Sequence, residues 1–314
     1  MKVAVCIPTW NRANTIGFAI DSLVNQKQFK FDIHIFDNAS TDKTQEIIEG
    51  NYSDKVYYHC NAENLGFVGN INRCLELAKD YDWIGILHSD DCHFSESVAI
   101  AMSYAIKYPD AGIIFSKYHY LDSNGTLKTW EQGEERIWKA GQEALAKCQG
   151  QIPCSSTFYK SEAILNLGLY SQEFPYSADE EYASRLATKY DIVETKEILA
   201  GYRRHGDHTM IKTWCKNDFI QSFEKMRIVM AKYTGLTENE AIPLVRQNLA
   251  EIFKASAGWL AAEGHWYPAM RFHAYALRHN PKLYLSAKAI AHAILQSMPI
   301  IGKIYYRHRL GWNI

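Results

Sequence analysis

Two adjacent carboxylates are the sharpest chemical feature of this 314-residue chain. Asp90 and Asp91 follow the apolar run at residues 83–87, after His88 and Ser89. Neighbouring acids repel each other unless a cation neutralises them. Carboxylate oxygens suit a hard divalent ion such as Mg²⁺ or Mn²⁺, which can offset the charge of a diphosphate. The alternative is an acidic cap at the start of the helix that follows.

Three more polar clusters stand directly after, or close behind, short apolar runs. They are Pro8-Thr9-Trp10-Asn11-Arg12, Asp37-Asn38-Ala39-Ser40 and Asn61-Ala62-Glu63-Asn64-Leu65-Gly66. An open parallel sheet binds its ligands outside the carboxyl ends of its strands. We therefore expect these clusters to converge with the acid pair on one edge of a sheet. The alternative is that they are ordinary polar loops.

The apolar runs themselves predict the strands that position these clusters. Runs at residues 3–7, 33–36, 56–59 and 83–87 alternate with helical spacing at 16–25, 41–49, 69–79 and 95–107. We expect Ser40 or Thr41 to cap the second of these helices and Ser95 the fourth. Strands that alternate with helices predict an α/β fold with a mostly parallel sheet flanked by helices.

The pattern changes beyond residue 111. We expect strands at 112–120 and 192–199, an extended segment at 153–159, and helices at 141–147, 161–167 and 178–189. After residue 213 the spacing predicts helices at 217–232, 238–262, 266–278 and 283–296. The predicted organisation is a catalytic domain over 1–212, with halves at about 1–110 and 111–212, and a helical region over 213–314.

Composition excludes several classes of protein. The chain has 34 Lys and Arg against 35 Asp and Glu, which argues against a dedicated nucleic-acid binder. Seven cysteines without a CxxC pair indicate reduced thiols in a cytoplasmic protein. The sequence predicts neither a signal peptide nor an apolar run long enough to span a membrane. The phosphate-binding GxxxxGK[ST], the dinucleotide-binding GxGxxG and the nucleophile motif GxSxG are also absent.

The last 51 residues have a charge bias of their own. Residues 264–314 contain seven Lys and Arg and neither Asp nor Glu. Apolar residues also recur there at helical spacing from Leu283 to Met298. This pattern predicts an amphipathic segment on an anionic membrane surface, which would place the protein peripherally on the inner face of the plasma membrane. The alternative is a helix packed on the protein itself or on a second subunit.

Taken in order, the polar clusters resemble the family-2 glycosyltransferases, which are inverting, GT-A-fold enzymes that use nucleotide sugars. The resemblance spans roughly residues 3–209. It is carried by six motifs: Val5-Cys6-Ile7-Pro8-Thr9-Trp10-Asn11-Arg12; Phe36-Asp37-Asn38-Ala39-Ser40-Thr41-Asp42; Asn64-Leu65-Gly66 with Asn70 and Asn72; Leu87-His88-Ser89-Asp90-Asp91; Ala178-Asp179-Glu180-Glu181-Tyr182 with Arg185-Leu186; and Tyr202-Arg203-Arg204-His205.

The resemblance implies a role for individual residues. The residues that it places at the nucleotide are Pro8, Thr9, Arg12, Asp37, Asn64, Gly66, Ser89 and Asp90. A divalent metal, Mn²⁺ or Mg²⁺, is implied at Asp90, Asp91 and the late residue His205. Asp179 aligns with the general base. The chain departs from the family at His88, where relatives often have Asp, and at Ala178, where many have Glu.

The implied reaction is a single displacement that inverts the sugar. Asp179 would take the proton of an acceptor hydroxyl, while the metal and Arg203 or Arg204 would offset charge on the leaving diphosphate. The resemblance implies a UDP-sugar as the first candidate donor, a glycan or lipid-linked saccharide as acceptor, and surface polysaccharide biosynthesis. The alternatives are a non-catalytic sugar-nucleotide or glycan-binding module of the same fold, and a nucleotidyltransferase, which the missing glycine-rich, lysine-containing loop disfavours.

Overall fold

The computed structural model describes residues 1–128, 133–148, 152–203, 209–262 and 264–285. The chain divides into two compact units, Met1–Gly206 and Asp207–Ile314. Each unit is described by itself below. The functional division that we predict at residue 212 stays a prediction.

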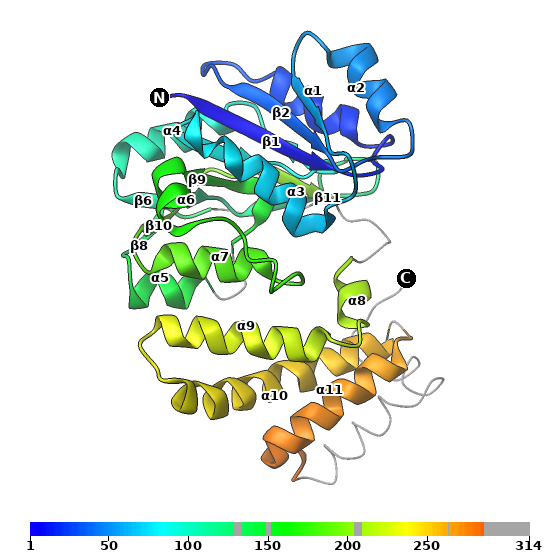
Figure 1. The fold of residues 1–314 in the computed structure, drawn as a ribbon, viewed down its shortest axis with the longest axis vertical. Coiled ribbons are helices and arrows are strands. Elements are labelled where there is room, and N and C mark those ends of the chain that lie inside the picture. Colours follow the sequence, from blue (N-terminus) through cyan, green and yellow to red (C-terminus); the bar gives the residue numbers. More distant parts are fainter. Residues whose placement is uncertain (129–132, 149–151, 204–208, 263, 286–314) are drawn as a thin grey trace. The chain divides into compact units, whose positions relative to one another are not determined.

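The first unit is built on an eight-stranded sheet in the order β3-β2-β1-β4-β9-β6-β10-β8 (Figure 1). Its strands are β1 (Val3–Thr9), β2 (Asp32–Asp37), β3 (Tyr57–Cys60), β4 (Trp83–Ile86), β6 (Ala111–Phe115), β8 (Arg136–Trp138), β9 (Thr157–Lys160) and β10 (Asp191–Glu194). Pairing is parallel except where β9 meets β4 and β6 and where β8 meets β10. The predicted mostly parallel α/β sheet is confirmed.

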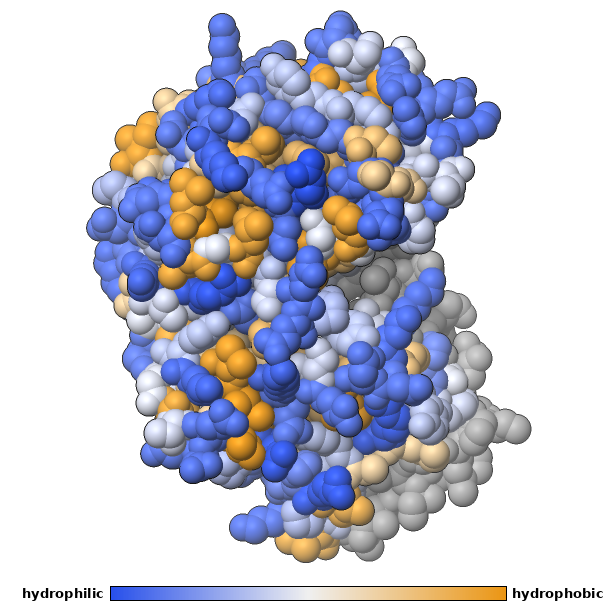
Figure 2. All heavy atoms as spheres, in the orientation of Figure 1, coloured by the Kyte–Doolittle hydropathy of each residue, from blue (hydrophilic) through white to orange (hydrophobic). Residues whose placement is uncertain are grey.

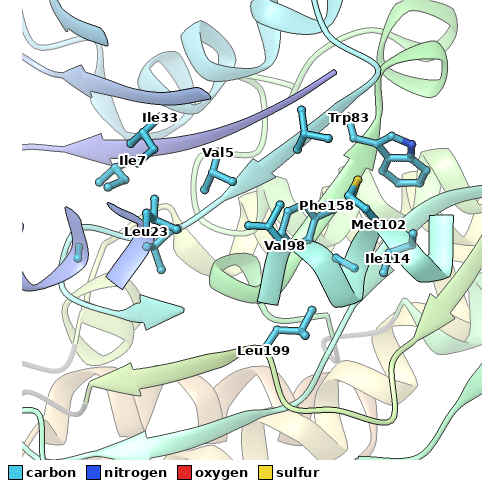
Figure 3. Close-up of a cluster of buried hydrophobic side chains, with 14 of the residues drawn as sticks. Val5, Ile7, Leu23, Ile33, Trp83, Val98, Met102, Ile114, Phe158 and Leu199 are labelled. Carbon is cyan, nitrogen blue, oxygen red and sulfur yellow. The ribbon is translucent and has the colours of Figure 1, made fainter. Parts of the chain in front are cut away.

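Helices cover both faces of this sheet, which explains why the central strands are apolar throughout. On one face, α1 (Ile16–Val24), α2 (Thr44–Tyr52) and α4 (Ser97–Lys107) enclose a core that includes Val5, Leu23 and Met102 (Figure 3). On the other face lie α3 (Gly66–Leu75), α6 (Ser161–Leu167) and α7 (Ala178–Ala187), which contact β1, β9 and β6 respectively. The helix α5 (Gln142–Lys147) packs against α7.

Two predicted strands are shorter than expected. The segment at 112–120 divides into β6 and the start of β7 (Tyr118–Leu121). In the segment at 192–199 the strand β10 already ends at Glu194, and β11 (Ala200–Arg203) begins just beyond the predicted strand. The second sheet has the order β5-β11-β7, where β5 is Cys92–His93. The buried hydroxyl of Ser116 accepts a hydrogen bond from the Leu199 amide at 2.9 Å. This bond holds the two segments together where they leave the large sheet.

Two predicted helix caps are wrong. The helix α2 starts at Thr44 because Ser40 and Thr41 are engaged elsewhere: Ser40 Oγ accepts from the Asn11 amide at 2.8 Å, and Asn11 Oδ1 accepts from the Thr41 amide at 2.8 Å. The helix α4 starts at Ser97, after Glu96, whose φ of 74° is left-handed. Ser95 therefore lies outside that helix.

The second unit consists of helices: α8 (Thr209–Trp214), α9 (Phe219–Tyr233), α10 (Glu238–Ala262) and α11 (Trp266–His279), followed by a 3₁₀ turn at Pro281–Tyr284. Its aromatic core includes Phe253 and Phe272, whose ring centroids are 4.4 Å apart. Among the residues described, no helix is both long and apolar enough to cross a membrane. The predicted helix at 283–296 lies almost wholly outside the described residues.

Candidate active site

The candidate site lies between β1 and β4, where the strand order of the large sheet reverses. From β1 the chain passes to α1 on one face of the sheet, and it reaches β4 from α3 on the opposite face. Open α/β sheets bind ligands at the carboxyl edge beside such a point. There the side chain of Arg12, which follows β1, meets that of Asp90, which follows β4, with Nε and Oδ2 3.6 Å apart. Their side chains are 44% and 19% exposed, so a ligand can reach both.

Hydrogen bonds to the next loop hold the β1 end of the site. The Arg12 amide donates to Thr44 Oγ1 at 2.8 Å, and the Asn38 amide donates to Thr9 O at 2.9 Å. Asn11 has a φ of 51°, a left-handed value that asparagine tolerates better than most residues. The buried hydroxyl of Thr9 has no hydrogen-bond partner among the residues that the structure describes. It is therefore a polar group at the strand end that a ligand can satisfy.

Asp37 lies at the end of β2, beside the end of β1, and is completely buried. Its Oδ1 accepts from the Ser40 amide at 2.9 Å and its Oδ2 accepts from the Tyr58 hydroxyl at 2.8 Å. Burial and this hydrogen bond to Asp37 raise the pKa of Tyr58, so the phenol remains a donor. Asp37 therefore fixes the strand end, with one hydrogen bond to each of its oxygens.

A network of amide side chains shapes the loop after β3. Asn38 is its hub: its Nδ2 donates to Asn64 Oδ1 at 2.9 Å and to Gly66 O at 3.2 Å, and its Oδ1 accepts from the Asn61 amide side chain at 3.1 Å. Asn61 also donates to Asn70 on α3 at 2.9 Å. This network brings the predicted residues Asn64 and Gly66 against the end of β2.

The two acids of the β4 loop have different environments. Asp90 reaches toward solvent, whereas Asp91 is only 1% exposed. Asp91 Oδ1 accepts from the Arg203 amide at 2.8 Å, and Oδ2 accepts from the Ser155 hydroxyl. Burial raises the pKa of Asp91 to about 6, even though His88, the Ser155 hydroxyl and the Arg203 amide oppose the rise. A buried carboxylate whose pKa is raised in this way gains stability from a cation at its side.

The acid pair and His88 form a donor set that a divalent ion fits. One ligand atom from each of His88, Asp90 and Asp91 lies within 4.8 Å of the other two. Burial lowers the pKa of His88, but Cys154, Asp91 and Asp90 outweigh that effect and raise it to about 10. His88 is therefore held as an imidazolium without an ion, and its ring must lose that proton before it can join the two carboxylates as a ligand of Mn²⁺, which takes both oxygen and nitrogen ligands. Among the His, Cys, Asp and Glu residues that the structure describes, His88, Asp90 and Asp91 form the cluster that is compact enough to hold an ion.

Asp179 approaches the same place from the other half of the unit. It stands in the first turn of α7, and burial raises its pKa. The charge of His88 partly opposes that rise, which means that Asp179 and the β4 loop are close enough to interact electrostatically. Arg185 fixes α7 by pairing with Glu181, with Nε and Oε1 2.9 Å apart, and by donating to Leu169 O at 2.7 Å.

Arg203 has a different role from the one expected of it. It is 5% exposed, and its guanidinium donates to Asp90 O at 2.7 Å and to Ser123 O at 2.8 Å. The group also stacks on the Phe18 ring, 4.5 Å from the centroid. It therefore braces the β4 loop, because two of its guanidinium nitrogens donate to backbone carbonyls and little of the side chain is exposed. Arg204 and His205, which were expected to face the diphosphate and the metal, lie outside the described residues.

Sequence reasoning missed the groups that hold these residues in place. Pro8 and Ser89 are found at the ends of β1 and β4 as expected, and Ser89 is 5% exposed. No motif pointed to Ser155, which bonds Asp91, or to His93, which bonds the backbone of Ser155. Pro153, which precedes the short 3₁₀ turn at Cys154–Ser156, was the local signal near Ser155. A turn signal of this kind does not indicate long-range partners.

Comparison with known proteins gives the class. A family model described as "Glycosyl transferase family 2" matches residues 4–164. The chain is 40% identical over 110 residues to the abequosyltransferase RfbV of Salmonella typhimurium, covering 33% of this chain and 32% of that protein. It is 24% identical over 243 residues to the chondroitin synthase of Pasteurella multocida, covering 74% of this chain and 24% of that protein.

Solved structures share the fold. S. aureus TarS 1–349 in complex with UDP-GlcNAc superposes with a TM-score of 0.64 at 16% identity, over 99% of this chain and 92% of that one. The mannosyltransferase PcManGT of Pyrobaculum calidifontis, in complex with GDP-Man and Mn²⁺, superposes with a TM-score of 0.54 at 16% identity, over 96% and 86%. The chain belongs to glycosyl transferase family 2 and has the GT-A fold, so it is a glycosyltransferase.

Proposed function

We propose that this protein transfers a sugar, with inversion, from a nucleoside diphosphate donor to a hydroxyl of a glycan or lipid-linked acceptor. The observation that carries the proposal is the contact between Arg12 and Asp90 at the ends of β1 and β4, where the strand order reverses. Asp91 and His88 lie beside this contact. The fold neighbours solved with UDP-GlcNAc and with GDP-Man support a nucleotide sugar as donor.

The carboxyl edge of the sheet offers the nucleotide an extended surface. We assign to it Pro8, Thr9, Arg12, Asp37, Asn64, Gly66, Ser89 and Asp90. The unpartnered hydroxyl of Thr9 and the exposed guanidinium of Arg12 supply polar contacts at the end of β1. Arg12 is the cation best placed to meet the diphosphate, because Arg203 is committed to backbone carbonyls. A UDP-sugar is the first donor to test.

His88, Asp90 and Asp91 would hold a divalent ion, Mn²⁺ or Mg²⁺. Such an ion supplies charge neutralisation at the leaving diphosphate. The fit rests on the ligand atoms within 4.8 Å of one another and on the burial of Asp91, whose charge has Arg203 N and Ser155 Oγ as its protein donors. We keep His205 as a further predicted ligand.

Asp179 is the proposed general base. Its raised pKa makes the ionised carboxylate a better proton acceptor than an ordinary aspartate. It takes the proton of the acceptor hydroxyl as the oxygen attacks the anomeric carbon, the bond from that carbon to the diphosphate breaks, and the diphosphate leaves on the opposite side. The configuration inverts because this displacement is a single step.

The acceptor and the cellular location are proposals about the surface. We propose a cytoplasmic enzyme of surface polysaccharide biosynthesis that touches the membrane with its C-terminal region. On α11, Tyr267, Met270 and Leu277 are 62%, 46% and 53% exposed, and Arg278 lies next to them in sequence. The face of the molecule in Figure 2 is mainly hydrophilic with separate apolar patches.

The decisive experiment compares the wild type with Asp179→Asn in the full chain. UDP-, GDP- and dTDP-sugars are supplied with Mn²⁺, and donor binding and donor hydrolysis are followed separately. We expect the variant to bind donor normally and to lose about 10²–10⁴ of turnover. Asp80→Asn, an exposed acid at the end of a short turn, is the matched control.

Two outcomes would contradict the proposal. If no donor of the panel binds or is hydrolysed, the transferase assignment to these sugars fails. If donor binds but neither protein turns it over under any acceptor condition, the non-catalytic binding module of the same fold is the better description.

A further inference from the structure

We propose that Ser155 and His93 are positioning residues for the acid pair: Ser155 orients Asp91 and the turn that carries Asp90, and His93 holds Ser155. The inference rests on the proposed metal role of Asp90 and Asp91. Neither Ser155 nor His93 belongs to the motifs on which the family resemblance depends.

The hydroxyl of Ser155 makes two bonds to one turn of chain. It donates to Asp91 Oδ2, and it accepts from the His88 amide at 3.2 Å. Within the same turn, the Asp91 amide donates to His88 O at 3.1 Å. One serine oxygen therefore ties the first and last residues of the segment 88–91. A single group that fixes both ends of a turn also fixes the residue between them that reaches the solvent, Asp90.

His93 holds Ser155 through its backbone. Its Nε2 is 2.9 Å from Ser155 O, and a carbonyl can only accept, so Nε2 carries the proton. The ring is 3% exposed, and its Nδ1 is buried with no hydrogen-bond partner among the described residues. The His93 amide is itself anchored, because it donates to Ser22 Oγ on α1 at 3.1 Å.

Arg203 closes the brace from the opposite side. Its amide binds Asp91 Oδ1 at 2.8 Å and its Nε binds Asp90 O at 2.7 Å. Asp91 is thus held from two sides. A residue of β11 binds its Oδ1, and a residue of the short turn before β9 binds its Oδ2. Groups of this kind, which contact metal-binding residues from behind, typically affect metal affinity or activity by about 10–100-fold when removed. The geometry assigns that role to Ser155, with His93 acting through it.

The test is Mn²⁺ binding to the full-length protein, measured from the electron paramagnetic resonance signal of free Mn²⁺. Ser155→Ala removes the hydroxyl and should raise the dissociation constant by about 10-fold or more. Ser155→Thr keeps the hydroxyl and should restore binding. Ser156→Ala is the matched control, because this neighbouring buried hydroxyl donates to Ser116 O at 2.7 Å instead of to the acid pair. Its Mn²⁺ affinity should equal that of the wild type.

His93 is tested by two substitutions. His93→Gln places an amide donor near the position of Nε2 and should keep the affinity, whereas His93→Phe removes the donor and should weaken it. The loss in the double variant Ser155→Ala/His93→Phe should be smaller than the sum of the single losses, because both act on one group. All variants are compared at equal folded fraction, checked by circular dichroism.

The inference fails if Ser155→Ala binds Mn²⁺ as the wild type does, or if Ser156→Ala weakens binding equally, which would indicate general loosening of the turn. Asp90→Asn separates this failure from that of the metal site. If Asp90→Asn leaves Mn²⁺ binding intact, the proposed metal site itself is wrong. If Asp90→Asn abolishes binding while Ser155→Ala does not affect it, only the positioning role is wrong.

Discussion

The ion pair inside α7 gives a prediction whose size follows from its asymmetric burial. The side chain of Glu181 is 3% exposed, whereas that of Arg185 is 20% exposed. Arg185 contacts both oxygens of the acid, at 2.9 Å and 3.0 Å, and also donates to Leu169 O at 2.7 Å. Arg185→Ala would remove both of these contacts from a buried carboxylate, and breaking a buried ion pair in this way destabilises by about 3–5 kcal/mol.

That free energy converts into a measurable shift in melting temperature. For a unit the size of Met1–Gly206, each 1 kcal/mol lowers the melting temperature by about 2–4 °C, so Arg185→Ala should melt about 6–20 °C below the wild type. Thermal unfolding followed by circular dichroism measures it. Because α7 also carries Asp179, the rate of sugar transfer by this variant should already drop at temperatures well below its unfolding transition.

The double variant tests the reasoning. Glu181→Ala/Arg185→Ala removes the stranded charge together with its partner, so it should melt above the single variant Arg185→Ala. Glu181→Ala alone should cost least, because the partly exposed Arg185 can still reach water and its carbonyl partner. If the double variant is no more stable than Arg185→Ala, the uncompensated buried carboxylate is not the cause of the loss and the argument is refuted.

Three further predictions concern the site and the surface. Asn38→Ala deletes four side-chain hydrogen bonds of the amide hub, worth about 1 kcal/mol each, and should lower the melting temperature and weaken donor binding in calorimetry; unchanged donor affinity would contradict it. Turnover should fall as the pH drops through the raised pKa of Asp179, so an acidic limb at or below the ordinary value of 3.8 would count against burial of the base. Vesicles with anionic lipid should sediment the full chain, and Tyr267→Ser/Leu277→Ser should abolish this; equal binding to zwitterionic vesicles would oppose the charge argument.

Local sequence patterns sufficed for the first half of the fold. The four apolar runs before residue 90 became four adjacent parallel strands. Buried strands need apolar residues on both faces, which explains the runs of β1, β2 and β4, whereas the edge strand β3 is partly exposed. The helices at 161–167 and 238–262 match their predicted bounds, because the spacing of apolar residues along a helix is a local pattern. The polar clusters after β1, β2 and β4 were correctly expected at one edge, because parallel strands place their carboxyl ends together.

Features that depend on distant partners were not predictable in this way. The break at Ser116 depends on the amide of Leu199, and the engagement of Ser40 depends on Asn11, so neither is visible in a local window. The brace on Asp91 joins Ser155 and Arg203 across 64 and 112 residues. Hydrogen-bond partners at such separations leave no periodic trace in a sequence.

The place of β9 in the large sheet has a consequence for how the chain matures. β9 comes from Thr157–Lys160, yet it lies between β4 and β6 and pairs with both. Until the ribosome has released this strand, the growing polypeptide carries β4 and β6 with open backbone edges, and such edges invite pairing with other chains. A shortened gene product that stops before residue 157 should therefore accumulate in inclusion bodies, and synthesis of the intact protein should benefit from chaperones that shield nascent strands.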